Sequence, residues 1–225
     1  MGGAQFKQTF PFLIKTFINF NSNIHITMKK RKVYSTILQI AKNIAKDKKG
    51  ALFVLGPKSN FKRKYEPLFP QILQDRSISE KGMEDTLERL ATLDGAVLLT
   101  NQGTLIANGV RLKKSKTVPG FGTKHAAAAG ITLAVPNSTA ILVSEEAHWV
   151  KIFHDGKITL ELDPNTETPR SIHNKIISFI TDRDAALLTA AGASAALLGL
   201  TPTLVIGGTY LVVKTATGII RKKFG

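Results

Sequence analysis

The sequence predicts an α/β fold, a mixed β-sheet flanked by helices, and three observations support this prediction. Short apolar runs of the length of buried strands alternate with segments whose apolar residues recur at helical spacing. Apolar residues make up 43% of the 225 residues, which is enough for a hydrophobic core and favours one main domain. Some neighbouring strands are joined by tight turns and others are separated by helices, so the sheet should be mixed.

The composition divides the chain into three parts. Residues 1–27 are expected to be a peripheral N-terminal extension, either disordered or a weak surface anchor, because their Phe and Asn residues follow no clean period. Residues 28–165 form the predicted α/β domain. Residues 166–225 form a predicted helical, apolar segment rich in Ala and Gly, and no residue of 185–213 is charged. One membrane-spanning helix, a hairpin of two short helices and a soluble packing or oligomerisation helix remain open for that stretch.

The first half of the domain contains two predicted helices and one strand. Apolar residues at helical spacing predict an amphipathic helix over 33–46. A short apolar run closed by Gly-Pro predicts a buried strand at 50–56. Residues 57–80 are polar and broken by prolines, so a loop-rich connection is expected. The segment 80–93 carries a stripe of apolar residues and predicts a second helix.

The second half is dominated by strands. Residues 94–100 and 103–112 read as a hairpin with an Asn-Gln-Gly turn. An alanine-rich helix is expected over 124–134. A further strand is predicted at 139–146, and residues 149–162 read as two strands joined by an Asp-Gly turn. Helices between strands of this kind complete the predicted mixed α/β domain.

Charge and cysteine content limit the function classes. The formal net charge of +15 attracts phosphates, nucleic acid or anionic lipid. No aromatic residues interleave the basic clusters, so we expect no specific nucleic-acid partner, and a basic nucleic-acid-binding protein is kept as the rival of another class. Without cysteine there is no disulfide framework and no thiolate metal site. We expect a cytoplasmic protein, with membrane association through 185–213 as an open alternative.

The stretch GFGTKH opens the alanine-rich helix and is the first candidate for a binding site. Gly120 and Gly122 let backbone amides approach a ligand closely. The free N–H groups and the dipole of a helix N-terminus favour an anion. Thr123 can cap the helix and offer a hydroxyl, while Lys124 and His125 add a cation and a donor. The loop would hold a triphosphate well, although an ordinary strand-to-helix turn with a surface lysine also explains it.

Acidic residues mark two strand ends. Asp94 begins Asp-Gly-Ala at the start of a predicted strand. An aspartate at this place is commonly part of a turn, but it can also bind a divalent metal through hard oxygen ligands or help to deprotonate a hydroxyl. Ser144, Glu145 and Glu146 end a later strand. They are either a polar strand end or a second source of metal or ribose ligands.

The order and spacing of these segments resemble the diadenylate cyclase domain, the enzyme that makes cyclic di-AMP. The resemblance runs from about Ile37 to Leu162 and is greatest to the small stand-alone archaeal branch. The segments that carry it are GALFVLG, LDGAV, GTKHAAAAGIT, TAILVSEE and VKIFHDGKITLEL.

The resemblance implies a reaction and a set of site residues. Each subunit of the family binds one ATP, and two subunits face each other, so a homodimer or higher homo-oligomer is expected. Each ribose 3′-hydroxyl attacks the α-phosphorus of the facing ATP and releases pyrophosphate, with Mn²⁺ or Mg²⁺ as cofactor. The resemblance assigns Asp94, Gly95 and Ala96 to catalysis, Leu112, Gly122, Thr123, Lys124, His125 and Ser144 to ATP binding, and Asp94, Glu145 and Glu146 to the metal.

The chain departs from the family at one segment. Lys124 and Ala126 stand where the family's Arg-His-Arg sequence has arginines. Because lysine is a point charge without the planar fork of arginine, the grip on the triphosphate should differ. A catalytically weak or inactive nucleotide-binding homologue is therefore the nearest rival of the enzyme. The neighbouring cations that could compensate are Arg111, Lys113, Lys114 and Lys116.

Overall fold

The computed structural model describes residues 9–165 and 168–182, with the backbone alone as far as residue 25. Its strands are β1 (Ala51–Gly56), β2 (Tyr65–Pro67), β3 (Ala96–Thr100), β4 (Leu105–Leu112), β5 (Thr139–Val143), β6 (Val150–His154) and β7 (Lys157–Leu162). They form one sheet in the order β2-β4-β3-β1-β5-β6-β7. β1 and β3 pair in parallel and the other neighbours are antiparallel, which confirms the predicted mixed sheet.

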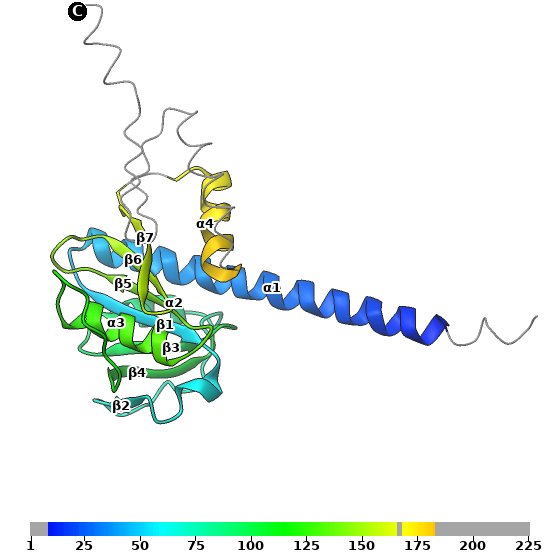
Figure 1. Ribbon diagram of the computed structural model, residues 1–225, viewed down its shortest axis with the longest axis horizontal. Coiled ribbons are helices and arrows are strands. Elements are labelled where there is room, and N and C mark those ends of the chain that lie inside the picture. Colours follow the sequence, from blue (N-terminus) through cyan, green and yellow to red (C-terminus); the bar gives the residue numbers. More distant parts are fainter. Residues whose placement is uncertain (1–8, 166–167, 183–225) are drawn as a thin grey trace, which may run out of the picture.

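Helices cover both faces of the sheet (Figure 1). The described helices are α1 (Thr9–Lys46), α2 (Met83–Ala91), α3 (Thr123–Ala134) and α4 (Arg170–Asp182), with a short 3-10 helix at Lys58–Phe61. Buried residues of α1, α2 and α4 share one core with the sheet, whereas α3 packs on the opposite face. Side chains along β1 alternate between these cores: Phe53 and Leu55 face the first, and Leu52 and Val54 face the second.

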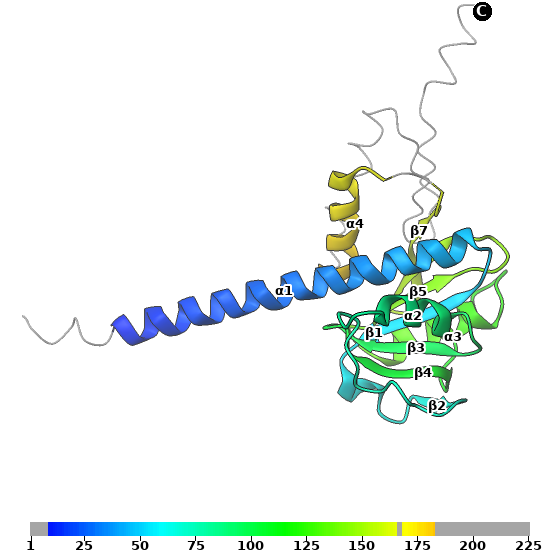
Figure 2. The ribbon, with the colours of Figure 1, turned by 180° about the vertical axis from the view of Figure 1, so that it is seen from behind.

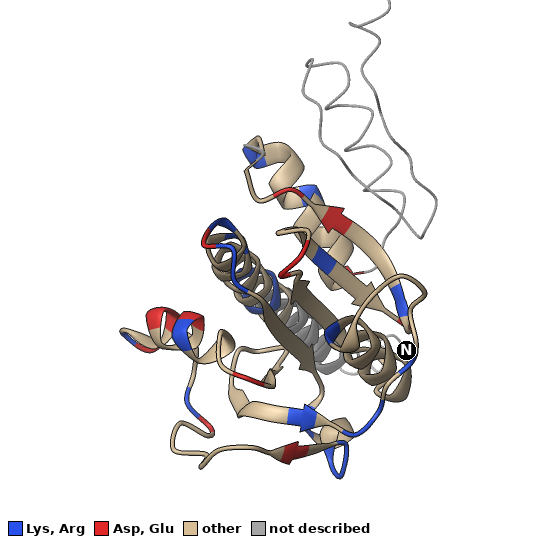
Figure 3. Cartoon of the chain, turned by 90° about the vertical axis from the view of Figure 1, so that its left-hand side faces the viewer, with Lys and Arg blue, Asp and Glu red and all other residues tan. Residues whose placement is uncertain are grey.

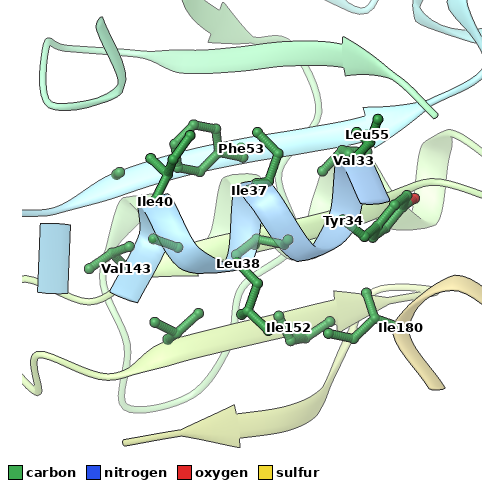
Figure 4. Close-up of a cluster of buried hydrophobic side chains, with 14 of the residues drawn as sticks. Val33, Tyr34, Ile37, Leu38, Ile40, Phe53, Leu55, Val143, Ile152 and Ile180 are labelled. Carbon is green, nitrogen blue, oxygen red and sulfur yellow. The ribbon is translucent and has the colours of Figure 1, made fainter. Parts of the chain in front are cut away.

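The larger core is built mainly by α1. Ile37 and Leu38 are fully buried and lie over β1 and β6, as Figure 4 shows. Phe53 of β1, Ile152 of β6 and Ile180 of α4 complete the contact. The spacing of apolar residues after Val33 is therefore the amphipathic stripe that the sequence predicts.

The helix α1 begins at Thr9, rather than at Val33 as expected. Its N-terminal part extends away from the sheet in both ribbon views (Figures 1 and 2). Ile26 and Met28 are 53% and 67% exposed. Because this part of the helix does not lie on the sheet, it needs no stripe of apolar residues. The lack of a helical spacing of apolar residues in 1–27 therefore did not exclude a helix.

The helix α4 belongs to the domain core rather than to the tail. Ile172, Ile176 and Ile180 are buried in the core that α4 shares with α1 and the sheet. Arg31 of α1 forms an ion pair with Asp182 at 2.7 Å. The packed core therefore includes residues beyond position 165. No helix among the described residues is long and apolar enough to cross a membrane. The predicted segment 185–213 lies outside the described residues.

One long connection joins the parallel pair. Between β1 and β3 the chain forms the 3-10 helix, the edge strand β2 and helix α2. The sequence predicts α2 but not β2, because Tyr65–Pro67 is short and contains a proline. An edge strand tolerates proline since its outer N–H groups have no ladder partner. This connection brings Glu66 and Leu68 alongside β4.

Candidate active site

The predicted site residues gather at one edge of the sheet, the edge formed by the ends of its strands and not by an outer strand. Ala51 pairs with Val143, and Ala96 pairs with Val110. The starts of β1 and β3 therefore lie beside the ends of β4 and β5. Both the Asp-Gly-Ala segment and the Ser-Glu-Glu segment meet this edge, and the N-terminus of α3 lies over it.

The larger of two adjoining cavities has a volume of about 370 Å³. Asp94, Gly95 and Ala96 line one side, and Thr123 and Lys124 of α3 line another. The remaining lining residues are Leu52, Leu68, Val110, Arg111, Leu112, Ser115 and Ala127. The floor is thus apolar, and the charged groups stand at the rim.

The smaller cavity, of about 150 Å³, lies on the other side of Lys124. It is lined by the remaining predicted residues, Gly122, His125, Ser144, Glu145 and Glu146, together with Thr123, Lys124, Leu142 and Val143. Thr123 and Lys124 line both cavities. Asp94 and His125 therefore do not share one cavity but face two that meet at the first turn of α3.

The conformation of the turn at Asp94 is fixed by a hydrogen bond from the next backbone N–H and by the glycine at position 95. The N–H of Gly95 donates to Oδ1 of Asp94 at 2.8 Å. Gly95 has a φ of +93°, and a Cβ there would lie 2.6 Å from the backbone nitrogen of Val110. Glycine is thus required for both conformation and close approach. The second carboxylate oxygen of Asp94 is left for a ligand at the exposed mouth of the larger cavity.

The first turn of α3 carries N–H groups without a side-chain acceptor. Gly122 is the N-cap residue, and no side chain caps the helix. The expectation that Thr123 caps α3 is wrong, because Thr123 is already the first helical residue. Its hydroxyl is free to face the cavities that it lines, and the uncapped amides favour an anion at that place.

The three carboxylates predicted for a metal are not assembled in one site. Glu145 pairs with Lys124, and its side chain lies over Gly50, where a Cβ would collide with it. Asp94 precedes β3 and Glu145 follows β5, and β1 lies between these two strands in the sheet. Among the described residues no three His, Asp or Glu side chains are grouped for a metal ion. Within one chain, Asp94 therefore lines the larger cavity, and Glu145 and Glu146 line the smaller one.

A single carboxylate still fits a nucleotide-bound cation. Mg²⁺ is usually held by one or two carboxylates together with substrate phosphates rather than by a complete protein cage. Asp94 lines the larger cavity, and only its Oδ1 accepts a hydrogen bond from the described part of the chain. The residues present therefore fit a divalent metal bound jointly with phosphates at Asp94.

His125 is buried beneath the glycine loop. It is 6% exposed, and no described group hydrogen-bonds to its Nε2. The Phe121 ring stacks on it with a centroid distance of 4.4 Å and an interplanar angle of 22°. Burial, followed by the nearby charge of Lys151, lowers the pKa of His125 to about 4. The imidazole is therefore neutral at neutral pH, and His125 lines the smaller cavity.

Ser144 shapes the turn that presents the two glutamates. Its N–H donates to the carbonyl of Trp149 at 3.0 Å, and its Oγ accepts from the N–H of Ala147 at 3.3 Å. Both contacts hold the turn after β5. Glu145 and Glu146 on that turn are exposed.

Glu66 engages two of the four basic residues considered as compensating cations. Its carboxylate pairs with Arg111 at 3.2 Å and with Lys113 at 2.9 Å. The hydrogen bond from Lys113, followed by the charge of Lys113, lowers the pKa of Glu66. Lys116 donates to the carbonyl of Gly156 at 3.0 Å. The side chain of Lys114 makes no hydrogen bond or ion pair within the described part of the chain. The basic residues of the loop after β4 are blue in Figure 3.

Sequence reasoning missed three residues that pack around His125 and the glycine loop at residues 120–122. Phe121, Lys151 and Glu161 form a cluster next to His125. A lysine inside the apolar segment Trp-Val-Lys-Ile-Phe, opposite a glutamate across a predicted hairpin, was the available signal. Glu66 gave no such signal, because its segment is loop-like in sequence.

The sequence of the chain matches a known family. The model of the family described as DisA bacterial checkpoint controller nucleotide-binding (DAC) matches residues 39–158, which is more than half of the chain. Two curated proteins named diadenylate cyclase are similar. The one from Methanocaldococcus jannaschii is 29% identical over 161 residues, which cover 67% of this chain and 52% of that protein. The one from Haloferax volcanii is 29% identical over 146 residues, with coverages of 60% and 52%. The chain spans about half the length of these curated relatives.

Two solved structures are similar over part of the chain. A structure described as a hypothetical membrane spanning protein from Bacillus cereus is 22% identical, with coverages of 56% of this chain and 61% of that chain and a TM-score of 0.47. A double-cysteine mutant of DacA from Staphylococcus aureus is 21% identical, with coverages of 67% and 95% and a TM-score of 0.47.

Proposed function

The chain belongs to the DAC family, and on that premise we propose that it is a diadenylate cyclase. It would condense two ATP molecules into cyclic di-AMP and release two pyrophosphates. The family model matches residues 39–158, and the two curated relatives named diadenylate cyclase match 67% and 60% of the chain.

One observation carries the proposal. Asp94, Lys124 and the uncapped first turn of α3 line the same cavity. A carboxylate, an ammonium group and free backbone amides around an apolar floor suit a nucleotide, because the floor takes the base and the rim takes the phosphates. Leu52, Val110 and Leu112 supply that apolar floor.

The groups of the chain have distinct roles in this reaction. Lys124 and the α3 amides bind the phosphates and stabilise the charge that develops as pyrophosphate leaves. The free oxygen of Asp94 accepts the proton of a ribose 3′-hydroxyl as its oxygen bonds to the α-phosphorus and the bond to pyrophosphate breaks. A divalent metal held by Asp94 and the phosphates would supply further charge neutralisation. Because Asp94 is exposed, the proton can pass on to solvent.

The reaction requires two copies of the site. Each ATP provides one attacking hydroxyl and one α-phosphorus, so ring closure needs two nucleotides that face each other. We propose a homodimer or higher homo-oligomer in which the exposed mouths of two larger cavities meet. A single subunit with one ATP would then be nearly inactive.

The test compares the wild type with Asp94→Asn during incubation with ATP and Mn²⁺ or Mg²⁺. We expect the wild type to form cyclic di-AMP and pyrophosphate and the variant to lose this activity by about 10²- to 10⁴-fold, the contribution of a positioned proton acceptor. Product is measured by chromatography, and circular dichroism checks that the variant keeps its fold. Full activity of the folded variant would remove Asp94 from the mechanism.

The same assay separates the enzyme from its nearest rival. An inactive nucleotide-binding homologue would retain ATP without consuming it. The replacement of a family arginine by Ala126 is the observation that favours this rival. Bound, unconsumed ATP in the wild type under both metals would therefore refute the proposed activity.

A further inference from the structure

We propose that Lys151 is a positioning residue of the nucleotide site: its buried ammonium group holds the Phe121 ring, and through it the glycine loop and the His125 ring at the smaller cavity. The effect on activity rests on the proposed function. The structural effect on His125 does not, so the two can be tested separately.

Lys151 is a charged residue in the interior of the sheet. It is the second residue of β6, pairs in register with Leu142 of β5 and Glu161 of β7, and is only 3% exposed. Its Nζ lies 3.5 Å from Oε1 of Glu161. A buried ammonium group is costly unless partners replace its water. Glu161 supplies one partner, which leaves part of the ammonium surface to be covered.

Phe121 supplies the second partner. The Nζ of Lys151 lies 4.0 Å from the centroid of the Phe121 ring. A cation over the face of an aromatic ring is attracted by the ring quadrupole, and this attraction is strongest where the cation is withdrawn from water. Phe121 comes from an irregular loop and is still 38% exposed, so its own burial is not enough to fix it. The contact with Lys151 gives this ring a defined position.

The loop around Phe121 has few other anchors. Gly120 and Gly122 flank the ring, and a side chain at either position would meet nothing within 4 Å. Glycines give the loop conformational freedom that some contact must restrict. The N–H of Phe121 bonds to the carbonyl of Val118 at 3.1 Å, which is a contact within the loop itself. Lys116 and Val118 attach the preceding part of the loop to the β6–β7 turn and to the core. Lys151 is the polar contact that links Phe121 itself to the sheet.

The same ring positions His125. Phe121 stacks on the imidazole at 4.4 Å, and Phe153 meets it edge-on at 6.2 Å. These ring contacts hold an imidazole whose Nε2 has no hydrogen-bond partner among the described residues. A series of contacts thus runs from β6 through Lys151 and Phe121 to the first turn of α3. Loss of the cation would loosen that turn without removing any group that touches the phosphates.

The test uses substitutions at Lys151 in the full chain. Lys151→Met removes the charge and keeps the length, and Lys151→Arg keeps a cation that can still stack on an aromatic ring. Because Lys151→Met leaves Glu161 without its cation and can destabilise the fold, the double variant Lys151→Met/Glu161→Gln removes both charges together. Lys157→Met on the adjacent strand is the matched control, since it removes one exposed lysine.

Two measurements are made on each folded variant. Steady-state kinetics with ATP and Mn²⁺ give kcat and KM, and NMR follows the ring signals of His125, which are shifted by the stacked Phe121 ring. We expect the KM for ATP to rise about tenfold in both Met variants, with Lys151→Arg and Lys157→Met close to wild type. The His125 signals should move toward unstacked values in the Met variants alone.

The outcomes separate this inference from the proposed function. If the wild type forms no cyclic di-AMP, the proposed function fails, and the His125 signals still test the position of the ring. The inference is overturned if the folded double variant keeps both the wild-type KM and the wild-type His125 signals. An equal loss in Lys151→Arg and Lys151→Met would also overturn it, because the cation over the ring would then not matter.

Discussion

At the residue scale, Lys124 connects the two halves of the candidate site. It lines both cavities and pairs with Glu145. A point charge in this position can approach a phosphate from the first turn of α3, although it lacks the two-pronged hydrogen bonding of arginine. Asp94 stands across the larger cavity from it. The position of these two groups therefore depends on the turn at Gly95 and on the N-terminus of α3.

Gly95 gives a direct test of that dependence. Gly95→Ala places a side chain at a φ of +93° and brings a Cβ to 2.6 Å from the nitrogen of Val110. We expect the free energy of unfolding to fall by about 1–3 kcal/mol, the cost of a strained backbone, and the activity to fall because Asp94 shifts. Denaturant titration and the ATP assay measure the two effects.

Gly122→Ala is the control for this prediction. Gly122 has a φ of −82°, and a Cβ there would meet nothing within 4 Å. Its substitution should change the free energy of unfolding by less than about 1 kcal/mol. Equal destabilisation by both alanines would show that the turn at Gly95 has no special role.

The sequence could locate the site but not its supports. Asp94 lies directly before Gly95, and Lys124 lies shortly after Gly122. Such glycines mark where the backbone must turn or approach a ligand, and the structure places both residues on one cavity. Lys151 could not be assigned in this way, since a lysine in a strand is usually on a solvent-exposed face. Its burial depends on α3 and the glycine loop covering β6, which are contacts between distant segments.

At the scale of elements, α4 completes the core that α1 begins. Figure 1 shows α4 standing on α1 beside β7, and Ile180 lies in the shared core. The pair Arg31–Asp182 adds a contact at the end of α4, but exposed ion pairs contribute little to stability. The apolar side chains of α4 therefore account for its attachment.

Ile180→Ala tests this attachment. Ile180 is 1% exposed, so its truncation leaves a cavity between α4 and the sheet. We expect the free energy of unfolding to fall by about 2–5 kcal/mol in denaturant titration. Asn174→Ala changes an exposed residue of the same helix and should cost less than about 0.5 kcal/mol. If the two variants were equally stable, α4 would not be part of the cooperative core.

The periodicity of the sequence predicts those elements that pack on the sheet. The segment after Val33, the hairpin around Asp155 and the helix at Met83 all show the spacing that burial of one face requires. The part of α1 before Met28 could not be predicted by that reasoning, because it extends beyond the sheet. The edge strand β2 was missed since three residues are too few to show alternation.

At the scale of the whole molecule, the buried His125 and the half-buried His173 make folding sensitive to acid. Burial lowers the pKa of both His125 and His173, with smaller contributions from the charges of Lys151 and Lys42 respectively. Nε2 of His173 also lies 2.9 Å from the Ser35 hydroxyl on α1. Below the ordinary histidine pKa of 6.5, the unfolded chain binds protons that the folded chain does not.

The free energy of unfolding should therefore decrease as the pH falls from 6.5 toward about 4. Above pH 6.5 both states carry neutral histidines, so this contribution is constant there. Denaturant titrations at several pH values measure the slope. His125→Phe retains a ring against Phe121 and removes one titrating group, so it should flatten the slope. A slope unchanged in that variant would show that His125 is protonated in the folded state as easily as in the unfolded state.

The connection between β1 and β3 has a consequence for how such a site can diversify. It contributes Leu68 to the lining of the larger cavity and Glu66 as the ion-pair partner of Arg111 and Lys113. Its only strand is the short edge strand β2. Surface connections accept insertions and deletions more readily than the elements they join. Changes of length or sequence in this connection would alter which molecules enter the larger cavity, while Asp94 and the register of the central strands stay as they are.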